Sequence, residues 1–239
     1  MYTNTVIRKE KLVPNEYYHI YCRTVLKIPE FSGNENANKL AQNFLLANST
    51  NSSQAFDYLR ANQYSTLERA IEIAKEGEKL VDILCYSIKP NHYHLLIKEL
   101  KENGATDFTR RCNTSIAKYI NTKTERKGPL FESNFKSKHI DSNEYLLHLS
   151  VYVHLNPLDF LSGKEWRTNQ LTDWHTNKNK LLDYQWSSLK HFIKEDFSDP
   201  RISGEEIISS QFNNKNEYEV FLKEWSEYSF NKINDIVIE

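Results

Sequence analysis

The chain has 239 residues, of which 39% are hydrophobic and 13% aromatic, enough to bury the core of one domain with appendages. No run of about 18 apolar residues occurs, which argues against a membrane-spanning helix. The formal net charge of −1 argues mildly against nucleic-acid binding, so any contact with a polyanion would depend on a local concentration of positive charge.

The N-terminal third predicts one strand followed by helices. Residues 16–25 are aromatic and β-branched, which is typical of a strand. Residues 36–59 have a helical composition that the polar run 48–53 interrupts with a loop. Residues 66–78 repeat apolar side chains at helical spacing and predict another helix.

The middle of the chain predicts a hairpin, a helix and a fourth strand. Residues 81–88 and 92–99 have the composition of strands, and Pro90-Asn91 between them indicates a turn. Asp107 can cap a helix that runs to about residue 122. Residues 130–140, after the break at Gly128-Pro129, alternate like a fourth strand.

Another helix follows the fourth strand. Asp141 and Glu144 have the spacing of a capping box at its start, and Pro157 must stop it. Beyond Pro157 we expect, in order, a loop-rich insertion at 158–180, a compact anchor at 183–188, and two amphipathic helices within 205–228 broken at 213–214.

This order of elements predicts a ferredoxin-like α+β fold. The sequence strand, helix, strand, strand, helix, strand is the βαββαβ pattern of that fold, with the third strand central in an antiparallel sheet. Helices would cover one face, and the other face, or the open edge of the sheet, would be free for a substrate and the final helix. We assign a catalytic domain to 1–157 and a C-terminal helical extension, packed on that domain, to 158–239.

The pair His92 and His94 opens the third strand and is the first candidate for chemistry. Residues two apart on a strand point the same way, so both rings face one side, as a divalent metal would need. The alternative is two ordinary strand histidines. The preceding Pro-Asn turn and the apolar continuation favour the metal interpretation.

Tyr152 is the second candidate, because Asn156 lies four residues later on the same face of the predicted helix. At about 100° per residue, Tyr145, Leu149, Tyr152 and Asn156 fall within roughly 40° of one line. A tyrosine beside a metal held by two histidines suggests attack of a phenolate on a phosphodiester. The alternative is that Tyr152 is a core aromatic. His148 is a possible third ligand or base, and Tyr119 and Tyr145 are competing nucleophiles.

Positive charge is concentrated between Phe108 and Lys138, where eight basic and two acidic residues give 8 − 2 = +6. Such a segment can bind a polyanion even in a neutral protein. The alternative is a solvated helix face, with edge lysines that discourage aggregation. The residues expected to contact DNA phosphates are Arg110, Arg111, Lys118, Lys136 and Lys138.

The remaining compositional signals concern compartment. Cys22, Cys85 and Cys112 are odd in number and far apart, which fits neither a disulfide framework nor a metal clip. Residues 1–10 lack the apolar stretch of a signal peptide. We therefore expect reduced thiols in a cytoplasmic protein.

Five motifs in order resemble one known family, the single-tyrosine HUH transposases, and most closely the REP-associated tyrosine transposases. The resemblance covers roughly residues 15 to 190. The motifs are Pro90-Asn91-His92-Tyr93-His94-Leu95-Leu96, Leu130-Phe131-Glu132-Ser133-Asn134-Phe135-Lys136-Ser137, Glu144-Tyr145-Leu146-Leu147, Tyr152-Val153-His154-Leu155-Asn156-Pro157 and Trp186-Ser187-Ser188.

The resemblance implies a site and a reaction. His92 and His94 would be ligands of Mg²⁺ or Mn²⁺, Asn156 a polar ligand beside them, and Tyr152 the nucleophile. The substrate would be single-stranded DNA cut at a hairpin-marked site (an imperfect palindrome), giving a covalent 5′-phosphotyrosine and a free 3′-hydroxyl. We expect a monomer, with Tyr152 beside its own histidines, because the link between the fourth strand and the tyrosine helix is short; a dimer is the alternative.

Two other functions remain compatible with the sequence. A metal-dependent nuclease that uses water would leave no covalent protein–DNA adduct. A domesticated DNA-binding protein would bind hairpin DNA without cleaving it.

Overall fold

The fold is built on a four-stranded antiparallel sheet, in a computed structural model that describes residues 11–61, 64–167, 171 and 173–227. The strands are β1 (Tyr17–Arg23), β2 (Val81–Lys89), β3 (His92–Glu99) and β4 (Lys136–Ile140), and their order is β2-β3-β1-β4. The predicted α+β class and the ferredoxin-like strand order are thereby confirmed. Residues 1–10, where no leader was expected, and 228–239 lie outside the described part.

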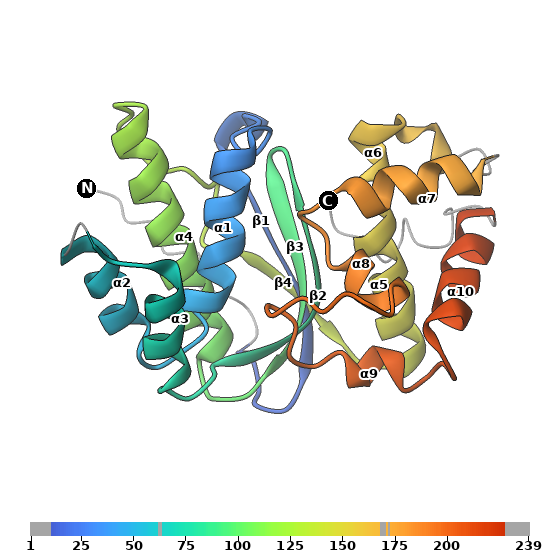
Figure 1. The fold of residues 1–239 in the computed structure, drawn as a ribbon, viewed down its shortest axis with the longest axis horizontal. Coiled ribbons are helices and arrows are strands. Elements are labelled where there is room, and N and C mark those ends of the chain that lie inside the picture. The colour runs from blue at the N-terminus through green and yellow to red at the C-terminus, as the bar shows by residue number, and fades with distance from the viewer. Residues whose placement is uncertain (1–10, 62–63, 168–170, 172, 228–239) are drawn as a thin grey trace.

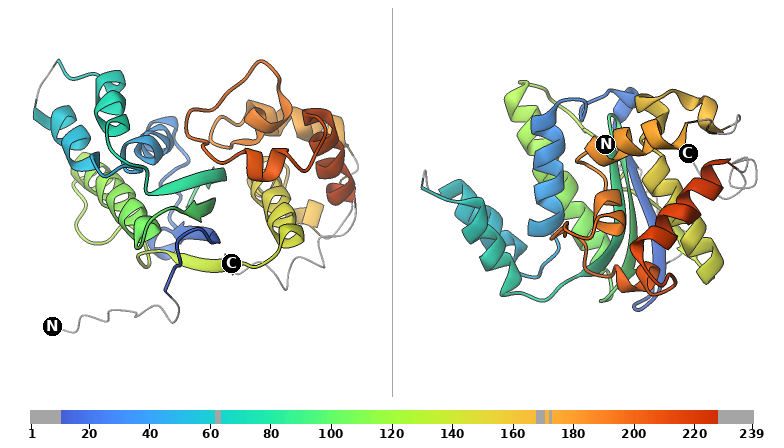
Figure 2. Two further views of the ribbon diagram at one scale, coloured as in Figure 1. Left: turned by 90° about the horizontal axis from the view of Figure 1, so that it is seen from below. Right: turned by 45° about the vertical axis from the view of Figure 1, so that its right-hand side comes forward.

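One face of the sheet carries the helices that the βαβ pattern requires. Helices α1 (Asn34–Leu46) and α4 (Gly104–Lys123) pack on it, and α2 (Ser52–Ala61) and α3 (Leu67–Lys75) form an outer pair (Figures 1 and 2). A short 3-10 turn, η1 (Val25–Lys27), follows β1. The polar interruption predicted near residue 48 is confirmed as the end of α1 and the loop before α2.

The opposite face is covered by α5 (Asn143–Leu155) and the elements that follow it (Figure 1). These elements are α6 (Leu158–Leu161), η2 (Lys164–Arg167), α7 (Trp174–Asp183), α8 (Leu189–Ile193), α9 (Glu206–Ser209) and α10 (Lys215–Glu227). The predicted loop-rich insertion at 158–180 is therefore wrong, since much of it is helical. The two helices expected within 205–228 are present, with a break between them. The domain boundary at 157/158 stays a prediction.

Helix boundaries differ from the prediction where two capping residues compete. Ser142, not Asp141, caps α5 by accepting a hydrogen bond from the Tyr145 N–H at 3.3 Å. Helix α4 begins three residues before Asp107, which lies in its first turn. Asp173 caps α7 by accepting from the Thr176 N–H at 3.0 Å, and this is the start signal in 158–180 that the overall polarity of the segment concealed.

The fourth strand is shorter than predicted. It spans Lys136–Ile140, and the earlier part of the predicted strand makes only an isolated bridge between Phe131 and Thr24. The chain joins the sheet only at Lys136. Just before it, the carbonyl oxygen of Asn134 accepts a hydrogen bond from Asn113 Nδ2 at 2.9 Å. Phe131 and Phe135 are buried in the core.

The two faces of the sheet differ in chemistry. On β1, Tyr18, Ile20 and Cys22 belong to the apolar core under α1 and α4. The alternate residues of the same strand point toward α5, and among them His19 and Tyr21 are also buried, at 1% and 3% exposure. Polar side chains are thus enclosed between the sheet and α5, and this layer contains the candidate site.

The C-terminal segments are tied to the sheet through buried polar contacts. His154 of α5 forms ring-nitrogen hydrogen bonds with Tyr218 Oη of α10 at 2.7 Å and with Ser188 Oγ at 2.9 Å. Ser188 Oγ in turn accepts from the Tyr86 N–H of β2 at 2.9 Å. The anchor predicted at 183–188 is therefore confirmed as a contact with β2.

Two further findings concern the whole described chain. Cys22, Cys85 and Cys112 are all free and buried. No helix in the described ranges is long and apolar enough to cross a lipid bilayer.

Acid should destabilise the fold through His154. Burial lowers the pKa of His154 to about 3, below its ordinary value of 6.5. Between those values the unfolded chain binds a proton that the folded chain does not, so stability falls as pH falls, by at most about 1.4 kcal/mol per pH unit for this group.

We expect His154→Gln to be less stable than the parent at pH 7.5 but to lose stability less steeply toward pH 4.5. Urea unfolding at both pH values measures this. Equal slopes for the two proteins would show that His154 does not carry the effect.

Candidate functional site

Strand β3 brings His92 and His94 together on the face that α5 covers. Their ring centroids are 4.9 Å apart, and the side chains are almost fully buried. His92 Nδ1 forms a hydrogen bond with Asn91 Oδ1 at 2.6 Å, within the turn that precedes the strand. The two histidines therefore share one side of the strand, as the alternation predicts.

A third histidine, His19 of β1, completes this group. Its Nε2 lies 2.9 Å from His94 Nδ1, and the two rings stack with centroids 5.2 Å apart. Sequence reasoning missed His19, because a histidine in an aromatic strand has no motif of its own. The only signal was that strand alternation puts it on the face opposite Tyr18 and Ile20.

Helix α5 places Tyr152 against the histidines of its own chain. The Tyr152 ring meets the His94 ring edge-on, with centroids 5.5 Å apart, and lies 6.3 Å from the His19 ring. Its side chain is fully buried. Tyr152 thus lies next to His94 within the described chain, and the roles of these residues stay a prediction.

Four polar residues form a buried cluster at the end of α5, one turn beyond Tyr152; we call it the α5 clamp. Asn156 Oδ1 accepts from Lys89 Nζ at 2.6 Å and from Arg167 Nη2 at 2.7 Å. Asp159 accepts from the same two cations, from Lys89 Nζ at 2.6 Å and from Arg167 Nε at 2.7 Å. The clamp consists of Lys89, Asn156, Asp159 and Arg167.

The cations of the clamp act on Tyr152, which lies next to it, and on Asp159 within it. The Arg167 guanidinium lies over the Tyr152 ring, 5.4 Å from its centroid. Burial raises the pKa of Asp159, but the hydrogen bond from Arg167 and the charge of Lys89 outweigh this, so the pKa lies below its ordinary value. Asp159 is therefore held as a carboxylate between two cations. Sequence reasoning missed Lys89, Asp159 and Arg167.

Asn156, the predicted third metal ligand, has its amide oxygen engaged by the clamp. Its Nδ2 is buried and has no hydrogen-bond partner among the described residues. Coordination of a metal through Oδ1 would require Lys89 or Arg167 to give way. The ligand role of Asn156 stays a prediction.

The other candidates on the helices lie away from Tyr152 or serve other contacts. The His148 ring packs on Trp225 of α10, with centroids 4.2 Å apart, and burial lowers the pKa of His148 despite the nearby Glu144. Tyr119 on α4 donates a hydrogen bond to Glu35 of α1, on the opposite side of the sheet. Neither contact brings these residues to His94.

The five predicted DNA-contacting residues divide between the two faces. Lys136 lies over the Tyr21 ring at 5.5 Å, and Lys138 lies over the Tyr145 ring at 5.1 Å, both on the α5 side of β4. Arg110, Arg111 and Lys118 lie on α4, across the sheet (Figure 2). Arg111 donates hydrogen bonds to the Ser49 carbonyl oxygen and to Ser52 Oγ, and Arg110 forms an ion pair with Asp107. The β4 lysines are therefore nearest to the candidate site.

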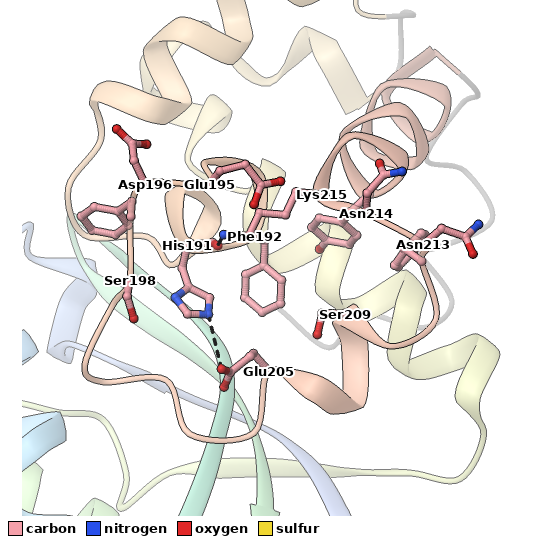
Figure 3. A pocket seen from close by; sticks show the side chains of 13 residues that line it. His191, Phe192, Glu195, Asp196, Ser198, Glu205, Ser209, Asn213, Asn214 and Lys215 are labelled. Atoms are coloured by element: carbon pink, nitrogen blue, oxygen red, sulfur yellow. Dashed lines mark hydrogen bonds and ion pairs between the residues drawn. The ribbon is translucent and has the colours of Figure 1, made fainter.

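The described residues contain no ready-made metal cluster, and they line a cavity that lies apart from the candidate site. Within the described ranges, no group of three or more His, Cys, Asp or Glu side chains is arranged to hold a metal ion. A cavity of about 560 Å³ lies among α8, α9 and α10, where His191 pairs with Glu205 at 3.9 Å (Figure 3). The predicted site residues do not line this cavity.

Comparison with known proteins adds a weak structural likeness. No protein-family model matches the chain, and no curated protein matches it. A solved structure described as a REP-associated tyrosine transposase bound to a REP hairpin is similar with a TM-score of 0.45 and 10% identity, over 83% of this chain and 90% of that chain. At this level the likeness carries no argument, so the interpretation depends on the geometry above.

Loss of His19 should destabilise the protein more than loss of a surface histidine. His19→Phe leaves His94 Nδ1 buried without its hydrogen bond, which costs about 1–3 kcal/mol. His139→Phe, the matched control, breaks an exposed pair with Glu16 but keeps a ring beside Tyr18, and should cost less than about 1 kcal/mol. Urea unfolding measures both. Equal losses would show that the His19–His94 contact contributes nothing specific.

Proposed function

We propose that this protein is an HUH-type transposase: a metal-dependent enzyme that nicks and rejoins single-stranded DNA at hairpin-marked sites through a 5′-phosphotyrosine on Tyr152. One observation carries the proposal, namely the contact of Tyr152 with His94 in the same chain, beside His92 and His19. A buried tyrosine held edge-on to a histidine cluster, rather than among aliphatic side chains alone, is suited to chemistry as well as to packing.

The reaction follows from the nucleophile. Tyr152 Oη attacks the phosphorus of a phosphodiester, the bond from phosphorus to the 3′-oxygen breaks, and the departing oxygen takes a proton to become a 3′-hydroxyl. The phosphotyrosine keeps the energy of the broken bond, so the same residue can return the strand to a 3′-hydroxyl. A hydrolase would release that energy to water, and this distinction separates a transposase from a nuclease.

The donor set fits a divalent cation held through His92 and His94. The Nδ1 atom of each ring forms a hydrogen bond, His92 with Asn91 and His94 with His19, so a metal would be bound through Nε2. Hydrogen bonding of the second ring nitrogen is the usual support of a ligating histidine. Mg²⁺ or Mn²⁺ bound there would polarise the scissile phosphate. Asn156 Oδ1 is the third ligand if it is released from the α5 clamp.

The β4 lysines supply the proposed contact with DNA. Lys136 and Lys138 are two residues apart on β4 and lie on the sheet face that carries His19 and Tyr21. A DNA strand bound along β4 would therefore lead toward Tyr152. Phosphate contacts of this kind position a strand without reading its sequence. They should make binding strongly dependent on salt concentration.

A covalent adduct should form on Tyr152 and on no other tyrosine. Incubation with labelled hairpin oligonucleotides and Mg²⁺ or Mn²⁺ should give an SDS-resistant protein–DNA band. Tyr152→Phe should abolish it, because the nucleophilic oxygen is gone. Tyr145→Phe is the control, because Tyr145 lies on the same face of the same helix, and this variant should retain the band.

The outcome also separates the alternative functions. Cleavage without an adduct in the parent protein would indicate a nuclease that uses water. Hairpin binding without cleavage would indicate a DNA-binding protein. An adduct that persists in Tyr152→Phe would mean that another residue is the nucleophile.

Loss of either metal-binding histidine should remove cleavage but spare DNA binding. His92→Ala and His94→Ala remove ligands, whereas affinity should come from lysines such as Lys136 and Lys138. A binding assay in EDTA and a cleavage assay in Mn²⁺ measure the two effects separately. Loss of binding in both variants would show that the histidines maintain the DNA surface.

The same variants test the monomeric arrangement. Mixing Tyr152→Phe chains with chains that carry both histidine substitutions should not restore cleavage, because each Tyr152 lies against its own His94. Restored cleavage would show that the tyrosine helix works in a partner chain.

A further inference from the structure

The α5 clamp connects the strand that bears the histidines to the helix that bears the tyrosine. Lys89 ends β2 and is the direct register partner of His92 across the β2–β3 pair. From there its ammonium reaches Asn156 at the end of α5 and Asp159 in α6, at 2.6 Å in each case. One side chain therefore joins the histidine hairpin to the end of the tyrosine helix.

The second cation of the clamp reaches Tyr152 itself. Arg167 binds both Asp159 oxygens, through Nε at 2.7 Å and Nη2 at 2.8 Å, and the same Nη2 reaches Asn156. Trp166 Nε1 also donates to Asp159, at 3.0 Å. The guanidinium is thus fixed by bidentate contact, in the geometry that arginine provides and lysine does not. Its Cζ atom lies over the Tyr152 ring, 5.4 Å from the ring centroid.

The clamp is shielded from water, so its geometry is strongly determined. The Lys89 and Asp159 side chains are only 6% and 5% exposed, and Arg167 is 15% exposed. Charges in such surroundings interact far more strongly than exposed pairs, and removal of one partner strands the others. Removal of one clamp residue would therefore displace the other clamp residues and the side chains that they contact.

We propose that Asp159 and Arg167 are positioning residues for Tyr152: through the clamp they hold its ring against His94. The catalytic meaning of this role rests on the proposed function. Because Asp159 and Arg167 both follow Pro157, the positioning role also assigns a function to the segment after Pro157. The Tyr152 ring thus contacts both the Arg167 guanidinium and the His94 imidazole.

The chain offers a closely matched control for this role. Arg201 binds Asp199 through Nε at 2.6 Å and Nη2 at 3.0 Å, and its guanidinium lies 5.1 Å from the Tyr86 ring. Asp199 is buried and Arg201 is 19% exposed. Asp199 and Arg201 lie between α8 and α9 and contact Tyr86 of β2 much as Asp159 and Arg167 contact Tyr152, away from His94. One difference is that Tyr86 Oη donates a hydrogen bond to Asp199 at 2.7 Å. Loss of this pair should harm stability in a similar way and leave Tyr152 undisturbed.

The test compares Arg167→Gln and Asp159→Asn with Arg201→Gln. Protein labelled with ¹³C on its tyrosine rings gives ring signals, and the signal that is absent from Tyr152→Phe belongs to Tyr152. We expect that signal to shift or broaden in Arg167→Gln and Asp159→Asn, and to stay in place in Arg201→Gln. Arg167→Lys keeps the charge but loses the bidentate contact, so it should restore the signal only in part.

The second readout is the rate of adduct formation at saturating hairpin DNA. Arg167→Gln should form the adduct on the order of 10- to 100-fold more slowly, as expected for a misplaced reacting group, with DNA affinity changed less than about 2-fold. Arg201→Gln should keep the parent rate. Thermal unfolding of every variant identifies any that fails to fold, and Arg167→Lys then replaces Arg167→Gln in the comparison.

The outcomes separate the clamp from the proposed function. An unchanged Tyr152 signal in Arg167→Gln and Asp159→Asn would overturn the positioning role, and so would equal loss of adduct rate in Arg201→Gln. Absence of an adduct in the parent protein would overturn the proposed function alone, because the ring signal still reports whether the clamp positions Tyr152.

Discussion

The packing of α5 across a sheet face that holds buried polar side chains is the constraint on which the rest of the structure depends. A helix laid on such a face must supply partners for imidazoles and hydroxyls as well as apolar contact, because a buried polar group without a partner is costly. Tyr152 packs edge-on against the His94 ring, and His154 forms hydrogen bonds with Ser188 and Tyr218. The helices on the other face meet a largely apolar surface, with polar contacts such as the hydrogen bond from Tyr93 Oη to Asn113 Oδ1 at 2.8 Å.

The electrostatics of the molecule follow from the same division. Net charge is near zero, yet two cations with side chains only 6% and 15% exposed lie in the α5 clamp, and two lysines of β4 lie over aromatic rings. The local field around the tyrosine is therefore set by a few fixed contacts and not by the protein as a whole. The basic residues of α4, which dominate the charge pattern in the sequence, serve α4 and the loop before α2 instead.

Strand alternation and proline predicted much of this arrangement. The side shared by His92 and His94 needs only the period of a strand, and the position of Tyr152 near the end of a helix needs only Pro157. His19, Asp159 and Arg167 could not be found in this way, since their meaning comes from tertiary partners and no repeat marks them. The start of α5 was misplaced by one residue because Asp141 and Ser142 are equally good caps, and only the folded chain chooses between them.

The order of these partners along the chain has a consequence for biosynthesis. His154 lies 64 residues before Tyr218, to which it is hydrogen bonded, and Tyr86 lies 102 residues before Ser188. A ribosome that has made the whole sheet and α5 has not yet made the residues that close the polar layer. The nascent sheet and α5 must then wait without Ser188 and Tyr218 until α8 and α10 emerge. In this interval they are exposed to the chaperones and proteases that recognise incomplete domains.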